Sequence, residues 1–94
     1  MDRQTYTQFV QDRIAGFGMG DPILVRDLGN GIAAEYGMDD KKANAAAAVA
    51  VKRIMEAGTV PALRCFCKGI YYLTKQTVFG ETGINKEKLI GIKY

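Results

Sequence analysis

The sequence predicts a small domain that is mainly α-helical and carries a small β-hairpin. An alanine-rich stretch over about residues 39–57 has apolar residues at spacings of three and four, as an amphipathic helix does. The next stretch, over about residues 60–74, changes to a period of two and can turn at Lys68 and Gly69, as a hairpin does. A helix followed directly by a basic hairpin is typical of a winged helix-turn-helix. We therefore expect a three-helix core with a wing and an extra C-terminal helix.

The helix over residues 39–57, the expected recognition helix, has agreeing signals at both ends. Asp39 and Asp40 suit a first turn, and Gly58 is placed to end the helix in the left-handed conformation. The expected buried face consists of Ala43, Ala47, Ala50, Val51 and Ile54. The residues expected outside that face are Lys41, Lys42, Asn44, Ala45, Ala48 and Lys52. The helix is therefore expected to bury one face and expose a basic one.

Three further helices are expected, at about residues 4–16, 26–36 and 85–92. The first places Val10 and Ile14 on one face. The second is less regular, because Gly29 and Gly31 each cost about 1 kcal/mol relative to alanine inside a helix. A short strand is expected at residues 23–25, before the second helix. The chain stops while the last helix is still apolar, so we expect that helix to pack on the domain or on a second copy, or the chain to be a fragment.

Length and composition limit the class of protein. The 94 residues suffice for a single domain with one core and no metal or disulfide. No apolar run approaches the roughly 18 residues of a membrane span, and the polar N-terminus does not resemble a secretory signal. We therefore expect no membrane association, a cytoplasmic location and reduced cysteines.

Charge is unevenly distributed along the chain, whose overall net charge is only +3. Residues 41–75 hold seven Lys or Arg against one Glu, a net charge of +6. Residues 1–40 carry −4 and residues 76–94 carry +1. A basic helix and hairpin beside an acidic remainder is the charge pattern of a surface that meets phosphate.

Catalysis is not expected, because the chain has no histidine to activate a serine or cysteine nucleophile. No cofactor or metal is implied by the residue pattern. Cys65 and Cys67 are two apart on an expected strand, where they would share a face and could form only a strained disulfide. Three readings of the pair are open: small structural side chains, a redox-sensitive wing, or a zinc site pooled by two copies.

The segment from Val51 to Glu81 resembles a known family. Its motifs are Val-Lys-Arg-Ile at 51–54, Gly58, Lys-Gly-Ile-Tyr-Tyr-Leu at 68–73, Lys75 and Thr-Val-Phe-Gly-Glu at 77–81. They look like the N-terminal winged-helix domain of antitoxins from abortive-infection, type IV toxin–antitoxin systems and related prokaryotic transcriptional regulators. The resemblance covers about residues 23–90. It implies operator DNA as partner, bound through the third helix and the wing, together with a cognate toxin and repression of the protein's own operon.

The DNA-binding residues predicted from this reading are Lys41, Lys42, Asn44, Ala48, Lys52 and Arg53 on the helix, with Arg64 and Lys68 on the wing. The helix departs from a usual major-groove reader, because it presents mainly alanines. Asn44 is the expected base reader, so we expect weakly selective binding dominated by phosphate contacts. The alternative is a winged helix that binds a protein through its alanines and not DNA. A homodimer through the first or last helix is also compatible with the sequence.

Overall fold

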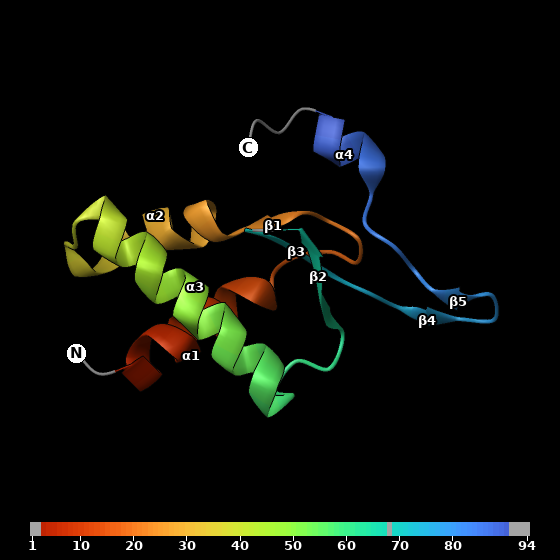
Figure 1. The fold of residues 1–94 in the computed structure, drawn as a ribbon, viewed down its shortest axis with the longest axis horizontal. Helices are drawn as coiled ribbons and strands as arrows, with labels where there is room; N and C mark the ends of the chain where they lie inside the picture. The colour runs from red at the N-terminus through yellow and green to blue at the C-terminus, as the bar shows by residue number, and fades with distance from the viewer. Residues whose placement is uncertain (1–2, 68, 91–94) are drawn as a thin grey trace.

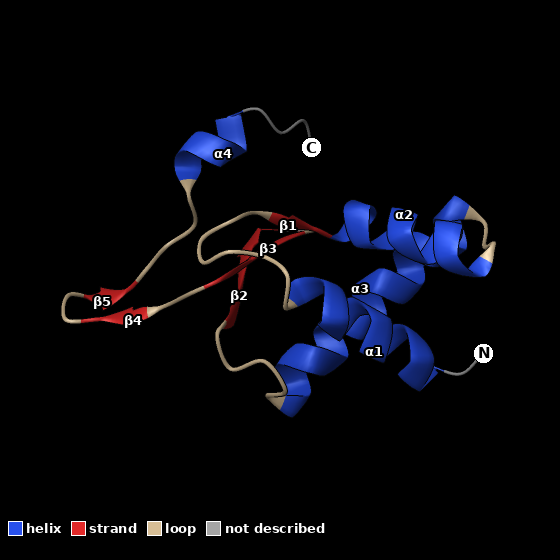
Figure 2. Cartoon of the chain, turned by 180° about the vertical axis from the view of Figure 1, so that it is seen from behind, coloured by secondary structure: helices blue, strands red, loops and turns tan. Residues whose placement is uncertain are grey.

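The computed structural model describes residues 3–67 and 69–90, which form a layer of helices beside a small sheet (Figure 1). In chain order the elements are α1 (Arg3–Ile14), β1 (Ile23–Leu24), α2 (Val25–Tyr36), α3 (Asp40–Ala57), β2 (Leu63–Cys67), β3 (Ile70–Leu73), β4 (Gln76–Thr77), β5 (Gly80–Glu81) and α4 (Lys86–Ile90). α3 packs against both α1 and α2 (Figure 2). Among the described residues the chain is thus a small, compact α+β domain of four helices and a small antiparallel sheet.

The helical core is built around the small side chains of α3. Its predicted buried face is confirmed, since the buried residues of α3 are Ala43, Ala47, Ala50, Val51 and Ile54. Val10 and Ile14 of α1 and Leu28 and Ile32 of α2 complete the helical part of the same cluster. α1 ends at Ile14, two residues before its expected end, and Phe17 beyond it still packs against the core.

α2 has its two glycines where neighbouring helices come closest. A Cβ atom built on Gly29, which is buried, would lie 2.8 Å from the Cα atom of Asn44 on α3, closer than real Cβ atoms approach other atoms. A Cβ atom on Gly31 would lie 3.3 Å from the ring of Phe9 on α1. The glycines that weaken α2 as an isolated helix therefore allow it to pack closely in the fold.

The main sheet has the strand order β1-β3-β2, with both neighbouring pairs antiparallel. The hairpin expected over about residues 60–74 is observed as β2 and β3, and the short strand expected at 23–25 is observed as β1. β1 adds to the hairpin by pairing Leu24 with Ile70. The main sheet therefore consists of the predicted hairpin and the predicted short strand.

A second hairpin, which we name the arm (residues 76–81), consists of β4 and β5 and was not predicted from the sequence. It projects along the long axis of the molecule, away from α1 and α3 (Figures 1 and 2). Backbone atoms fix its base, because the amide of Thr82 donates to the carbonyl of Lys75 at 2.9 Å. The hydroxyl of Thr74 also donates to the carbonyl of Thr82 at 2.6 Å.

The short helix α4 is attached to the loop that precedes β1. The amide of Asn85 donates to the carbonyl of Gly20 at 2.7 Å, and Lys88 forms an ion pair with Asp21 at 2.6 Å. The prediction of a helix over about 85–92 extends past residue 90, where the described part ends. No described helix is both long enough and apolar enough to cross a membrane.

Candidate nucleic-acid interface

The position of α3 is set by a three-residue connection to α2. Gly37 ends α2 in the left-handed conformation, with φ of 64°. The carboxylate of Asp39 then caps α3 by accepting hydrogen bonds from the amides of Lys41 and Lys42, at 3.1 and 3.4 Å. These two contacts occupy amide groups at the helix start that have no partner within the helix. Asp39 is therefore the N-cap of α3, and Asp40, which was expected with it in the first turn, is the first residue of the helix.

The exposed side of α3 carries four cations. Lys41, Lys42, Lys52 and Arg53 are all exposed, as is Ala48. Within residues 3–67 and 69–90, none of these four cations forms an ion pair. Glu56 is also exposed, one turn after Lys52. The structure therefore brings together four of the predicted DNA-binding residues on one helix, none of them in an ion pair within the described residues.

The exposed residues of α3 form two adjacent rows, because residues three and four apart lie on the same side of a helix. The first row contains Lys41, Ala45, Ala48 and Lys52. The second row contains Lys42, Val49 and Arg53. Each row thus has cations toward its ends and small or apolar residues at its centre.

Asn44 does not lie where the sequence reading placed it. It is partly buried rather than exposed, and its Oδ1 atom is buried without a hydrogen-bond partner. Its Cα atom lies against Gly29 of α2. The side chain therefore belongs to the contact between α2 and α3. The expectation that Asn44 points outward is wrong, because the missing side chain at position 29 lets α2 approach this edge of α3.

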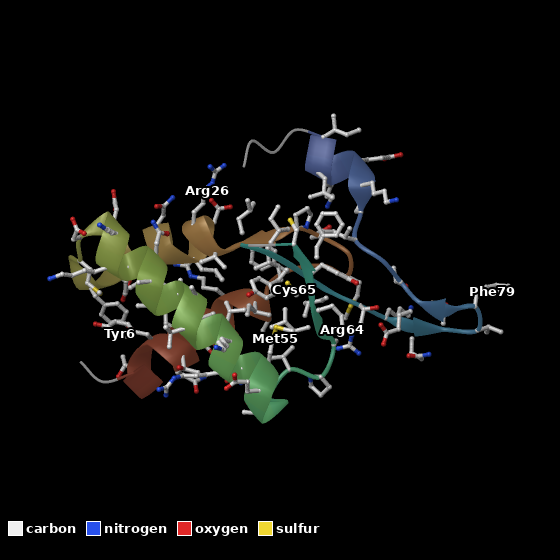
Figure 3. The ribbon with its side chains drawn as sticks, viewed as in Figure 1. Tyr6, Arg26, Met55, Arg64, Cys65 and Phe79 are labelled. Atoms are coloured by element: carbon white, nitrogen blue, oxygen red, sulfur yellow. The ribbon has the colours of Figure 1, made fainter. Side chains whose placement is uncertain are left out.

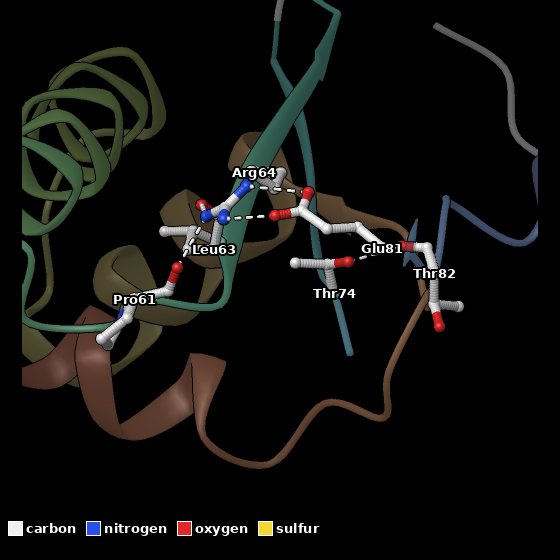
Figure 4. A network of polar contacts seen from close by, with 6 residues as sticks. All are labelled: Pro61, Leu63, Arg64, Thr74, Glu81 and Thr82. Atoms are coloured by element: carbon white, nitrogen blue, oxygen red, sulfur yellow. Dashed lines mark hydrogen bonds and ion pairs between the residues drawn. The ribbon is translucent and has the colours of Figure 1, made fainter. Parts of the chain in front are cut away.

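Arg64 is held by contacts within the chain (Figure 4). Its Nη2 atom donates to Glu81 at 2.9 Å, and its Nη1 atom donates to the carbonyls of Pro61 and Leu63 at 2.6 and 3.0 Å. The hydrogen bond and charge of Glu81 raise the pKa of Arg64. Arg64 therefore connects β2 to the arm, and we do not count it among the free cations.

The tip of the β2–β3 hairpin includes Lys68, which lies outside the described residues. The structure does place this tip next to the start of α2, because the amide of Val25 donates to the carbonyl of Gly69 at 3.0 Å. Arg26 follows Val25 and is exposed (Figure 3). Sequence analysis missed Arg26 as a candidate, although its position at the start of the second expected helix was a signal that could have identified it.

Cys65 and Cys67 are separated by an irregularity in the pairing of β2 with β3. Cys65 pairs with Tyr71, whereas Cys67 pairs with Ile70, the preceding residue of β3. Tyr71 and Ile70 are successive residues of β3 and point to opposite faces, so their partners Cys65 and Cys67 do not share the face that a regular strand would give them. Both cysteines are free, and the described residues contain no group of three or more potential metal-binding side chains.

A shallow apolar hollow lies between α1 and α3. Its volume is about 240 Å³, and it is lined by Thr7, Ala45, Ala46, Val49 and Ala50. Val49 retains 46% of its surface exposed there. The hollow thus includes one residue of each row, Ala45 of the first and Val49 of the second.

Comparisons with protein-family models, with curated proteins and with solved structures find no match to this chain.

Proposed function

We propose that the chain is a winged helix-turn-helix domain that binds double-stranded DNA through α3. The proposal is supported by the three-residue connection between α2 and α3, which contains Gly37, since such turns join the two helices of helix-turn-helix motifs. It is also supported by the element order, in which a strand precedes α2 and a two-stranded hairpin follows α3. The observation that carries the proposal is the exposed side of α3 with four cations, none of which forms an ion pair with another described residue.

In the proposed mechanism the amino end of α3 approaches the groove, and its cationic side chains attract phosphate, because the amides of Lys41 and Lys42 already donate to Asp39. Lys41, Lys42, Lys52 and Arg53 neutralise backbone phosphates on both sides of the small central residues. Arg26, beside the hairpin tip, is a further candidate for a phosphate contact, as is Lys68. Arg64 is left out of this set because Glu81 already pairs with it.

Sequence selectivity is expected to be weak. Ala45 and Ala48 offer base edges no hydrogen bonds and can contact only thymine methyl groups. Asn44 is turned toward α2 and does not enter the proposal as a base reader. Recognition would then depend on phosphate contacts, DNA shape and the half-site spacing of any dimer.

The biological role that we propose follows the resemblance noted above. The domain would act in a prokaryotic cytoplasm as a transcriptional regulator or as the N-terminal domain of an antitoxin, with a cognate toxin as its protein partner. Any enzymatic activity of such a system would belong to that partner.

The proposal is tested by fluorescence anisotropy with a mixed-sequence duplex of about 25 base pairs, at about 50 and 200 mM salt. Four phosphate contacts predict an affinity loss of about a hundredfold over this range, because each contributes about 0.9 to the log–log slope. Lys41→Ala with Lys52→Ala should reduce the loss to about tenfold. Lys75→Ala is the matched control, since it removes an exposed lysine at the base of the arm.

One observation favours a second candidate function, a winged helix that binds a protein. Ala45, Ala48 and Val49 are exposed at the centre of α3, as such a surface requires. The same experiment separates the two candidates. Absence of binding at about 50 mM salt would reject DNA binding and leave the protein-binding candidate.

A further inference from the structure

The tip of the arm exposes two large apolar side chains. Val78 and Phe79 retain 97% and 101% of their reference surface, so neither packs on any described part of its own chain. Figure 3 shows Phe79 at the end of the arm, remote from α1 and α3. Adjacent, fully exposed apolar residues of this kind more often mark a contact site than an ordinary surface.

The tip is held in a defined shape. The amide of Phe79 donates to the hydroxyl oxygen of Thr77 at 3.3 Å, and Thr77 in turn donates to the carbonyl of Gly80. At the other end of the arm, Arg64 donates two hydrogen bonds to Glu81. Because these hydrogen bonds already restrict the arm, it loses less conformational freedom when its tip is bound. Such preorganisation favours association.

The same chain carries a matching concave surface. The α1–α3 hollow of about 240 Å³ is almost entirely apolar in its lining. It is smaller than the roughly 300 Å³ at which small-molecule pockets begin, and its size suits a protruding side chain. The arm projects away from α1 and α3, so its tip is not placed to fill the hollow of its own chain (Figure 1).

We propose that a second copy of this chain is the occupant: the arm tip of each protomer enters the α1–α3 hollow of its partner. The argument for a second copy is that a projecting apolar tip and an apolar hollow are both present on one chain, too far apart to meet within it. A reciprocal exchange about a twofold axis makes two identical contacts and closes the assembly. The hollow is lined by Ala45 of the first row and Val49 of the second, whereas Lys41 and Lys52 are not among its lining residues. The inference does not depend on DNA binding.

The proposal is tested by sedimentation of the full chain under reducing conditions, which prevents disulfides through the free cysteines. The contact is small, so association should be weak and become visible between about 10 and about 500 µM. Phe79→Asp and Val49→Asp each place a charge in the contact and should each give a monomer. Both positions are exposed, and circular dichroism should show that both variants remain folded.

Mixing the two monomeric variants gives the sharpest result. A Phe79→Asp chain keeps an intact hollow and a Val49→Asp chain keeps an intact tip, so one of the two contacts can form between them. The mixture should therefore show a 1:1 dimer, weaker than the wild-type dimer, although neither variant associates alone. Ile90→Asp is the matched control, because Ile90 is 86% exposed but lies on α4, and this variant should associate like the wild type.

Each other outcome overturns the proposal. A wild-type chain that stays monomeric throughout the concentration range excludes self-association. A dimer that survives Val49→Asp but not Phe79→Asp indicates contact between two arm tips. Loss of the dimer in Ile90→Asp indicates an interface through the last helix. A mixture of the two monomeric variants that stays monomeric contradicts the reciprocal exchange.

Discussion

The crossing of α2 and α3 and the tip of the arm are two apolar surfaces built in opposite ways. At the crossing, Gly29 meets the backbone of α3 so closely that an added atom has no room, and the buried face of α3 consists largely of alanines. At the arm tip, Val78 and Phe79 stand in solvent with room on every side. The comparison teaches that side-chain size alone does not locate the core here. The helices are joined by close approach, whereas Val78 and Phe79 take no part in the described core.

The largest loss of stability is expected at Gly29, where α2 crosses α3. Gly29→Ala should lower the free energy of unfolding by about 2 kcal/mol, because the added Cβ atom meets the backbone of Asn44. The value of about 2 kcal/mol is the net loss, after the gain of about 1 kcal/mol that alanine brings in helix propensity. Urea unfolding followed by circular dichroism measures it.

Gly31→Ala is the control for that substitution. It adds the same atom to the same helix, but the neighbour is the Phe9 side chain at 3.3 Å, which can move. Its effect on the free energy of unfolding should be small. Equal losses in the two variants would show that the cost lies in α2 itself and not in the crossing.

A smaller effect, confined to the attachment of α4 through Asp21 and Lys88, is expected at low pH. The hydrogen bond and charge of Lys88 hold the pKa of Asp21 below its ordinary value of 3.8. Because the folded pKa is lowered, the attachment is complete above the ordinary value and is lost as pH falls through the lowered one. NMR titration of the Asp21 carboxyl group should show a midpoint that rises in Lys88→Met. An unchanged midpoint would mean that the ion pair does not hold α4 in solution.

The smallest effect on stability is expected at the arm tip. Phe79→Ser should change the free energy of unfolding by no more than about 0.5 kcal/mol, because surface substitutions away from specific contacts rarely do more. Urea unfolding at low micromolar concentration, where the chain is monomeric, provides the comparison with Gly29→Ala. A marked loss in the free energy of unfolding would show that Phe79 packs within its own chain, as the residues at the α2–α3 crossing do.

The buried face of α3 could be predicted from sequence because it depends on a period within one helix. Its end signals, Asp39 and Gly58, are also local, and both act as expected in the structure. The position of Asn44 could not be predicted in the same way. It lies at the edge of the buried face, and its burial depends on Gly29, a residue of another helix.

The arm and the pairing of Arg64 show a second limit of sequence reasoning. β4 and β5 contain only two residues each, too few to display an alternating pattern. Val78 and Phe79 also lack the composition of the common two-residue turns. The partner of Arg64 is 17 residues away in the sequence, so no local spacing could have indicated that the guanidinium is already paired.

The close contact at Gly29 also constrains how relatives of this chain can diverge. A Cβ atom at position 29 would strike the Cα atom of Asn44, which every amino acid has, so no replacement at position 44 relieves the clash. The Oδ1 atom of Asn44, in contrast, has no hydrogen-bond partner to lose. Descendants that keep this crossing should therefore retain glycine at position 29, while position 44 drifts among small residues. Two residues in contact need not co-vary when the clash persists against the backbone of one of them.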